Sequence, residues 1–385
     1  PRPPLVVLPF DGPGGTSLIG DGIAFQINDE LARYPQLFVI STVSAVTLVR
    51  DKLPISEIAE MLKVRYLVTG AAGFIGSCLL HHFSREEHHT LIAVDDFHPP
   101  QKKANYQEAS NLTFIDRTAF IPWFMENGHT IDLCLHIGAR TDTTEQNMSV
   151  LADLNTHYSQ FIWEACVNFS IPLIYASSAA TYGDGTHGYN DDHQVIKDLK
   201  PLNPYGQSKQ DFDVWALEQE DKPPFWAGLK FFNVYGPNEY HKGRMASVVY
   251  HTYQQILKTG KMNLFKSHRS DYEDGFQSRD FVYVKDVISV ISFLAHQRPE
   301  SGIFNLGSGV ANPFLHLAQY TFEAMHRSPE IGFIDTPEDI RDTYQYYTCA
   351  SMEKLRNAGY TKAFHTLKEG VFDYVQGYLM PQRYF

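Results

Sequence analysis

Tyr205 and Lys209 stand four positions apart in the stretch Tyr-Gly-Gln-Ser-Lys, and residues four apart share one face of a helix. A phenol titrates at a pH of about 10 in water, which is too high for a useful base, but a nearby ammonium favours the phenolate and lowers that pKa. Ser178 follows an apolar run and could hydrogen-bond a substrate oxygen while its proton moves. The Tyr-Lys spacing is common by chance, so it predicts proton transfer only together with the elements that position it.

Three glycines spaced three apart lie between an apolar, β-prone run at 65–69 and an amphipathic segment at 77–89, for which we predict a helix. Gly70 permits a turn closed to residues with a Cβ, Gly73 lets the main chain approach a pyrophosphate, and Gly76 lets the helix pack closely on the strand. The N-terminus of that helix would offer N–H groups to the phosphates. The order of strand, glycine turn and helix therefore predicts a dinucleotide-binding turn.

A second apolar run, 91–94, ends in Asp95 and Asp96. This is about twenty residues beyond the turn, where a dinucleotide fold places the acid that meets the adenosine ribose. An ordinary strand–turn–helix unit is the alternative. Asp95 by itself favours NAD, whereas Lys102 and Lys103 could hold a 2′-phosphate. We therefore expect NADP, with NAD as the other possibility.

Further β-like runs recur along the chain and are separated by helical stretches such as 150–169. They lie at 112–115, 132–136, 173–176 and 229–232. Strands that alternate with helices predict a parallel, doubly wound α/β sheet, with ligands at the carboxyl ends of its strands. We expect this nucleotide-binding domain at 65–235, and a smaller α/β substrate-binding region at 236–385 that is interleaved with it.

Residues 1–64 show a separate β-α-β-α order, with a glycine-rich loop expected at 11–22. The runs at 7–10, 20–22, 37–40 and 62–68 resemble the small N-terminal domain of TolB-like proteins. The strand that would continue this module is the first strand of the nucleotide fold. We therefore expect an incomplete appendage, and we assign no chemistry to it.

The composition limits the partners of the chain. Its net charge of −12 argues against a phosphate-backbone partner, because nucleic-acid binding favours a basic face. No apolar stretch reaches the roughly 18 residues that a membrane span needs, and no secretory pattern is present. The four cysteines lack Cys-x-x-Cys spacing, so we expect reduced thiols in a cytoplasmic protein. We also expect no metal site, because the histidines at 81, 82, 88 and 89 have no obvious third ligand type.

The serine, the glycine turn and the Tyr-Lys spacing together resemble the extended short-chain dehydrogenase/reductases that act as nucleotide-sugar epimerases and dehydratases. Dehydratases of that group usually carry an Asp-Glu pair where this chain has Ala179-Ala180, which speaks against water elimination. From about Arg65 to its end, the chain closely resembles the ADP-L-glycero-D-manno-heptose 6-epimerases. The segments that carry this resemblance are 175–183, 233–237, 241–248 and 279–284.

The resemblance implies roles for individual residues. Tyr205 and Lys242 match two acid/base residues on opposite faces of a transient carbonyl, and Ser178 and Lys209 match the residues that support them. The implied cofactor contacts are Gly70, Gly73, Phe74, Ile75, Gly76, Asp95, Asp96, Lys102, Ile137, Gly138, Ala139, Arg140, Thr141, Asn155, Lys209, Val234 and Lys242. The implied substrate contacts are Asn233, Arg244, His251, Phe265, Lys266, Ser267, His268, Arg279 and Tyr344.

Two segments depart from the family pattern. The loop 137–141 differs from the better-known Gly-Ala-Cys-Ser sequence of the family, although its contact with the cofactor could be made mainly by backbone groups. Residues 269–277 form a small insertion before Arg279.

The activity that the resemblance implies is inversion of C6 in an ADP-heptose by transient oxidation with bound NADP. The enzyme would be a cytoplasmic homo-oligomer that supplies lipopolysaccharide core synthesis. Two other functions remain open. A 4-epimerase of nucleotide sugars would share the fold and the chemistry of Tyr205, and a non-catalytic module would bind the nucleotide sugar without turnover.

Overall fold

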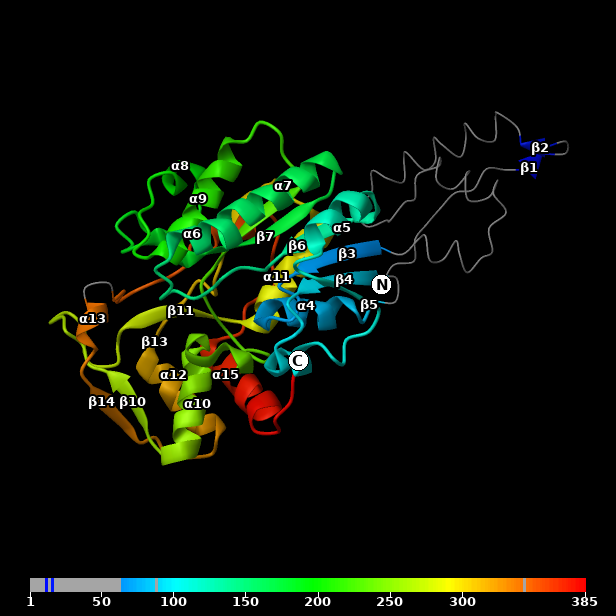
Figure 1. Ribbon diagram of the computed structural model, residues 1–385. Coiled ribbons are helices and arrows are strands. Elements are labelled where there is room, and N and C mark those ends of the chain that lie inside the picture. Colours follow the sequence, from blue (N-terminus) through cyan, green and yellow to red (C-terminus); the bar gives the residue numbers. More distant parts are fainter. Residues whose placement is uncertain (1–10, 13–14, 17–63, 87–88, 342–343) are drawn as a thin grey trace.

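A seven-stranded, fully parallel sheet forms the centre of the computed structural model (Figure 1). The structure describes residues 64–86, 89–341 and 344–385, together with 11–12 and 15–16. In spatial order the strands are β12 (Gly302–Leu306), β8 (Trp226–Phe231), β7 (Leu173–Ser178), β6 (Leu133–His136), β3 (Val64–Thr69), β4 (His89–Asp95) and β5 (Leu112–Asp116). The expected doubly wound α/β sheet is therefore confirmed, and each strand predicted for it is present.

The strands of this sheet are apolar along most of their length because helices cover both faces. In β3, Tyr66 and Val68 pack into one core cluster and Leu67 packs into the other, since successive side chains point to opposite faces of a sheet. The first face is covered by α4 (Phe74–Phe83) and α11 (Val284–Gln297). The second face is covered by α5 (Phe120–Asn127), α7 (Tyr158–Asn168) and α9 (Pro204–Glu218) (Figure 1).

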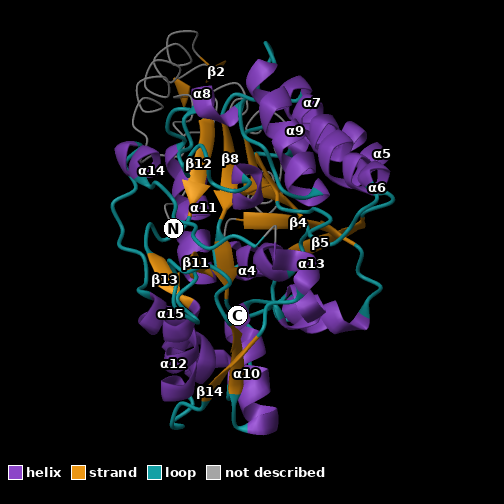
Figure 2. Ribbon diagram, turned by 90° about the vertical axis from the view of Figure 1, so that its left-hand side faces the viewer, coloured by secondary structure: helices purple, strands orange, loops and turns teal. Residues whose placement is uncertain are grey.

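A smaller region beside the main sheet is built mostly from the C-terminal part of the chain, and Figure 2 shows it extending away from β8 and β12. Its strands are β9 (Asn233–Tyr235), β11 (Ser278–Tyr283) and β13 (Ala311–Pro313) in a mixed sheet, and β10 (Met262–Phe265) and β14 (Ile331–Ile334) in a parallel pair. Its principal helices are α10 (Val248–Thr259), α12 (Phe314–Ala324) and α15 (Leu367–Tyr374). Strand β12 and helix α11 come from this half of the chain but belong to the main sheet and its cover.

Shorter elements complete the described part of the chain. They are η1 (Pro100–Asn105), η2 (Gly128–Thr130), α6 (Met148–Leu151), the π-helix η3 (Ala152–His157), η4 (Ala179–Tyr182), α8 (His193–Ile196), η5 (Tyr240–Met245), α13 (Glu338–Arg341), α14 (Glu353–Asn357) and the π-helix η6 (Val375–Leu379). None of the helices in the described ranges is long and apolar enough to cross a membrane. All four cysteines are free thiols, and three of them are buried.

Two predicted helices differ from the structure. The helix predicted at 77–89 is wrong at its end, because α4 stops at Phe83 and His89 is already the first residue of β4, paired with Val64. The helix predicted at 150–169 is present, but a π-helical stretch, η3, interrupts it. Of the proposed N-terminal appendage, residues 1–10, 13–14 and 17–63 lie outside the described residues. Within it, β1 (Asp11–Gly12) and β2 (Gly15–Thr16) pair antiparallel where we expected a loop.

The strand order reverses between β3 and β6, and this switch point is where a doubly wound sheet binds its ligand. Gly70 follows β3 with a φ of +68°, and Gly138 follows β6. A Cβ on Gly70 would lie 2.7 Å from the Cα of Gly138, and a Cβ on Gly138 would lie 2.9 Å from the nitrogen of Gly70. The two loops therefore approach each other at a distance that only glycine permits.

We predict that Gly70→Ala destabilises the protein more than Gly188→Ala does. Gly188 is the matched control, because its φ of +71° is similar and nothing lies within 4 Å of the Cβ that it would gain. Left-handed backbone alone accounts for about 1–2 kcal/mol in both variants, and overpacking against Gly138 adds a further ~1–3 kcal/mol only in Gly70→Ala. Urea unfolding measures both values, and equal losses would contradict the steric account.

Candidate active site

Helix α9 carries the tyrosine and the lysine that were identified from their spacing. The Asn203 side chain caps the helix by accepting a hydrogen bond of 2.8 Å from the N–H of Gly206, and Pro204 occupies the first turn, as is typical of helix N-termini. Tyr205 is therefore near the start of the helix, where its phenol hydrogen-bonds Ser178, the last residue of β7. The predicted grouping of Tyr205, Ser178 and Lys209 is present at the carboxyl end of a sheet strand.

Burial is the main influence on the pKa values of Lys209 and Tyr205. The ammonium of Lys209 is buried and donates to the carbonyl oxygen of Ala176 over 2.8 Å. Burial lowers the pKa of Lys209 to about 8, against the opposing effect of the Asp213 carboxylate. Burial also raises the pKa of Tyr205, although the hydrogen bond with Ser178 acts in the opposite direction. The lowered phenol pKa that we expected from the spacing is therefore absent here, because desolvation outweighs the stabilising contacts.

Lys242 lies beside the glycine turn although it is far from the turn in sequence. It belongs to η5, where Gly243 breaks the helical backbone with a φ of +54°. Its ammonium lies 5.4 Å from the centroid of the Phe74 ring, at the N-terminus of α4. Burial lowers the pKa of Lys242, and the buried carboxylate of Glu239 opposes that shift. This contact brings the second predicted proton carrier to the first helix of the nucleotide fold.

The turn 70–76 fits the pyrophosphate of a dinucleotide. Gly73 is the N-cap of α4 and has no side chain to cap the first N–H groups of the helix, which leaves these donors for an anion. A Cβ on Gly73 would meet only the carbonyl oxygen of Gly70, at 3.1 Å. Phe74 is buried and Ile75 packs against the core, so these two residues offer backbone rather than side-chain groups to a ligand.

Asp95 ends β4 and is bound on both oxygens. It accepts hydrogen bonds from the backbone N–H groups of Ala72 at 2.9 Å and Asp96 at 2.7 Å. The ammonium of Lys102 lies 2.9 Å from the same carboxylate. The predicted ribose acid therefore supports the glycine turn through Ala72, and Lys102 partly neutralises its charge.

Asn155 connects the loop after β6 to α9, the helix that carries Tyr205 and Lys209. Its side chain accepts from the N–H of Arg140 at 2.8 Å and donates to the carbonyl of Arg140 at 3.1 Å and to the Ser208 hydroxyl at 3.0 Å. It lies in the π-helix η3, and such bulges are frequent at functional sites. Gly138 in the same loop donates to the hydroxyl of Thr69 at 3.1 Å. The loop 137–141 is thereby held between β3 and α9.

The first group of predicted substrate residues lies on η5 and its neighbours. The guanidinium of Arg244 binds Asp142, with both oxygens at 3.1 Å, and the His251 ring contacts the carbonyl of Arg244 at 3.3 Å. Asn233 is exposed at the start of β9, and Val234 follows it. The loop after β6 and the segment that carries Lys242 are therefore joined directly.

The second group surrounds Arg279. Its guanidinium lies 5.4 Å from the ring centroid of Tyr344 and 5.6 Å from that of Phe314, and it donates to the carbonyl oxygens of Ser278 and Gln345. The Tyr344 ring in turn contacts Phe265. Arg279 is only 8% exposed, yet no carboxylate among the described residues forms an ion pair with it. A buried cation of this kind is suited to an anionic ligand.

The remaining predicted substrate residues form a loop next to this group. Lys266 pairs with Asp335 at 3.1 Å, the N–H of Ser267 donates to Asp274 at 2.7 Å, and the N–H of His268 donates to the Tyr346 hydroxyl at 2.8 Å. The Gln345 side chain also donates to the carbonyl of Gly183, just beyond η4. The second group is therefore tied to the segment that begins at Ser178.

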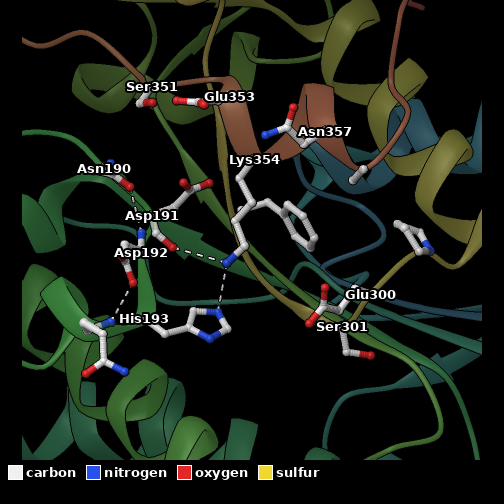
Figure 3. A pocket seen from close by; sticks show the side chains of 14 residues that line it. Asn190, Asp191, Asp192, His193, Glu300, Ser301, Ser351, Glu353, Lys354 and Asn357 are labelled. Carbon is white, nitrogen blue, oxygen red and sulfur yellow. Dashed lines mark hydrogen bonds between the residues drawn. The ribbon is translucent and has the colours of Figure 1, made fainter.

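A cavity of about 760 Å³ lies elsewhere, beside the amino end of β12, and it contains none of the predicted site residues. Figure 3 shows Lys354 at its centre, hydrogen-bonded to the His193 ring at 3.0 Å and to the carbonyl of Asp191 at 3.2 Å. His193 also accepts from the N–H of Ile303 at 3.1 Å. These polar groups satisfy one another and the free edge of β12, so this cavity is separate from the residues predicted to carry the chemistry.

A doubly wound sheet with a glycine turn at its switch point and a Tyr-Lys pair at its carboxyl edge defines a nucleotide-binding enzyme of the short-chain dehydrogenase/reductase type. The model of the NAD dependent epimerase/dehydratase family matches residues 66–307, and the chain belongs to this family. The family that we expected from the sequence is thereby confirmed, together with its nicotinamide dinucleotide cofactor.

Within this family, the chain is similar to enzymes that share one name. The chain is 44% identical over 323 residues to the ADP-L-glycero-D-manno-heptose-6-epimerase of Fusobacterium nucleatum, covering 81% of this chain and 97% of the relative. It is 42% identical over 322 residues to the enzyme of the same name from Nitratidesulfovibrio vulgaris, covering 82% and 98%. The crystal structure of the Helicobacter pylori ADP-L-glycero-D-manno-heptose-6-epimerase superimposes with a TM-score of 0.70 at 27% identity, covering 83% of this chain and 97% of that one.

We predict that Asn155→Ala loosens both the loop 137–141 and α9. The backbone groups of Arg140 and the buried hydroxyl of Ser208 would lose this partner, which costs about 1–3 kcal/mol of unfolding free energy. A displaced Tyr205 would lower kcat by about 10- to 100-fold. The control is Asn147→Ala, which removes an exposed helix cap with two hydrogen bonds and costs about 1 kcal/mol without a loss of kcat. Unchanged kcat in Asn155→Ala would contradict a positioning role.

Proposed function

We propose that this chain is an ADP-heptose 6-epimerase that interconverts the ADP-D-glycero- and ADP-L-glycero-β-D-manno-heptoses for lipopolysaccharide core synthesis. The observation that carries the proposal is the position of Lys242 beside Phe74 at the start of α4, which adds a second proton carrier to Tyr205 and its partner Ser178 at the end of β7. Inversion of a carbon that bears a hydroxyl needs proton transfer for both configurations, and the site supplies two proton carriers from separate elements. The names of the relatives at 42–44% identity support this choice of substrate.

The chain's own residues perform the proton transfers. The turn 70–76 would hold the pyrophosphate of a nicotinamide dinucleotide, which would supply a reversible acceptor for the hydrogen of C6 and its electron pair. One of Tyr205 and Lys242 takes the proton of the C6 hydroxyl as the carbon becomes a ketone, and the other returns a proton to the oxygen after the other face is presented. Ser178 holds the reacting oxygen, and the ammonium of Lys209 acts against the rise that burial causes in the pKa of Tyr205. Substrate and product differ only at C6, so no net oxidation occurs.

The diphosphate of the substrate fits the surroundings of Arg279. The guanidinium is buried between aromatic rings and hydrogen-bonds only neutral carbonyl groups of Ser278 and Gln345. A phosphate would supply the negative charge that the described residues do not provide there. The contact of Gln345 with Gly183 would then transmit substrate binding to the segment after Ser178.

The finer cofactor assignment is NADP. Lys102 lies 2.9 Å from Asp95, which reduces the repulsion that this carboxylate would exert on a 2′-phosphate. Lys103, the next residue in the sequence, adds a second positive charge. Arg117 adds a third, because it pairs with Asp96. This arrangement supports NADP over NAD, although the hydrogen-bonding capacity of Asp95 suits a ribose as well.

The proposal keeps the remaining expectations from the sequence. Residues 65–235 would bind the cofactor and 236–385 the sugar nucleotide, with β12 and α11 returning to the first domain. Family resemblance implies a homo-oligomer that works in the cytoplasm. Residues 1–64 would be an appendage without a catalytic role.

We predict that Tyr205→Phe and Lys242→Met each lower kcat by about 10²- to 10⁴-fold, the range for loss of a general acid or base. Lys258→Met, an exposed lysine on α10, is the control and leaves kcat unchanged. Proton NMR of the product formed from ADP-D-glycero-β-D-manno-heptose measures the reaction, with inversion at C6 expected for the wild type.

Three results would count against this function. Product with an unchanged C6 would exclude it, and inversion of C4 in a different nucleotide sugar, unaffected by Lys242→Met, would favour a 4-epimerase. Binding of NADP and of the sugar nucleotide without turnover would favour a non-catalytic module.

We predict that Lys102→Met weakens the binding of NADP at least about tenfold more than the binding of NAD, which corresponds to ~1.4 kcal/mol. The variant would leave the Asp95 carboxylate without its ammonium partner, so that it repels a 2′-phosphate. Fluorescence titration of the two cofactors measures the ratio of the Kd values. Lys103→Met serves as the comparison, because Lys103 is exposed and forms no ion pair with Asp95. Equal weakening of both cofactors by Lys102→Met would contradict the assignment of NADP.

A further inference from the structure

A fully buried ion pair lies beneath the catalytic helix. The ammonium of Lys230 on β8 lies 2.6 Å from the carboxylate of Asp213 on α9, and neither side chain has any exposed surface. Burying two charges is expensive, and apolar residues of similar size often give equal or greater stability. Stability alone therefore does not explain why two charged side chains are buried here.

The pair is hydrogen-bonded to β7 and to η4, which follows β7. Asp213 also accepts from the hydroxyl of Ser177 at 2.6 Å and from the phenol of Tyr175 at 3.1 Å. Lys230 also donates to the Thr181 hydroxyl at 2.7 Å. The contacts join α9, β7, β8 and η4 through charged groups whose geometry tolerates little displacement.

The same face of α9 meets β7 at three successive turns. Tyr205 contacts Ser178, Lys209 contacts the carbonyl of Ala176, and Asp213 contacts Ser177. Residues at i, i+4 and i+8 lie on one face of a helix, so a single displacement of the helix would break all three contacts. Asp213 is the most extensively bonded of the three, because its carboxylate accepts hydrogen bonds from both Ser177 and Tyr175 of β7.

We propose that Asp213, with Lys230 as its counter-ion, is a positioning residue that sets the register of α9 on β7 and keeps the ammonium of Lys209 charged beside Tyr205. This proposal rests on the proposed function in one respect, which is that Lys209 assists Tyr205 in catalysis. The ion pair and its contacts do not depend on which sugar is bound.

The charged and titratable groups around Lys209 favour this role. Asp213 lies on the same helix as Lys209, and His136 interacts with Lys209 from β6. Tyr205 lies in the first turn of α9, and Lys230 on β8 pairs with Asp213. Burial lowers the pKa of His136 to about 3, and Lys209 contributes to that shift, so His136 is neutral and offers no negative charge. Asp213 is therefore the carboxylate that opposes the desolvation of Lys209.

The sign of the effect follows from this arrangement. Lys209 is active as the ammonium, so its contribution is lost as the pH rises through its pKa of about 8. Removal of the Asp213 carboxylate lowers that pKa further, because a stabilising opposite charge is gone. The alkaline limb of the kcat profile must then move to lower pH. A purely structural role for Asp213 would change stability without moving that limb.

The test is a titration of Lys209 in the full chain without substrate, by NMR of ¹³C-labelled lysine, with Lys209→Arg used to assign the signal. In Asp213→Asn we expect the pKa of Lys209 to fall by about one unit or more, and the alkaline limb of kcat to move by the same amount. Asp213→Glu keeps the charge and restores both. The KM of the sugar nucleotide stays within about twofold of the wild type.

Asp213→Asn leaves the ammonium of Lys230 buried without its partner, so a second variant guards against loss of folding. Asp213→Asn combined with Lys230→Met removes both charges, and we expect the folded protein still to show a lowered pKa for Lys209. A folded double variant whose Lys209 titrates as in the wild type would overturn the proposal. If the wild type fails to invert ADP-heptose while the titration shifts as expected, the proposed function fails and the positioning role stands.

Discussion

The close approach of two backbone loops at the switch point is the constraint on which the rest of the structure depends. Gly70 and Gly138 allow the loops after β3 and β6 to meet at a distance that excludes any side chain. Because they meet, the N-terminus of α4 and the loop 137–141 share one edge of the sheet. The hydrogen bonds of Asn155 to Arg140 and to Ser208 then fix the position of α9 relative to that loop. The chemistry of the site follows from the geometry of this edge.

Each of the two lysines that we assign to the chemistry at this edge is accompanied by a buried carboxylate. Lys209 and Lys242 both have a pKa lowered by burial, and each faces one buried carboxylate, Asp213 or Glu239, that opposes the shift. The two ammonium groups are thus poised by the same balance of desolvation and attraction. Arg279 differs, because the described residues give it carbonyl groups and aromatic rings but no carboxylate partner. That difference separates residues suited to proton chemistry from one suited to an anionic substrate.

The sequence predicted what depends on short spacings. The glycine turn, the strands and the shared face of Tyr205 and Lys209 each follow from fewer than twenty residues, and the structure has them all. Sequence reasoning missed the pair of Asp213 and Lys230, because it depends on the register of α9 on two strands. The one signal was that Asp213 stands four residues beyond Lys209. The contact of Lys242 with α4 could be expected only from a long-range alignment with a family. The end of α4 was misjudged because the polar sequence at 85–89 continues the amphipathic pattern beyond the cap at Ser84.

The central claim is that one carbon of the sugar is oxidised and reduced again at this edge, between Tyr205 and Lys242. Its most direct test uses ADP-D-glycero-β-D-manno-heptose that carries deuterium at C6, with mass spectrometry and NMR of the epimerised product. The account predicts that the product is inverted at C6 and keeps its deuterium in ordinary water, because the hydrogen never leaves the site. Replacement of the deuterium by solvent hydrogen would show deprotonation at carbon instead, and it would contradict the account.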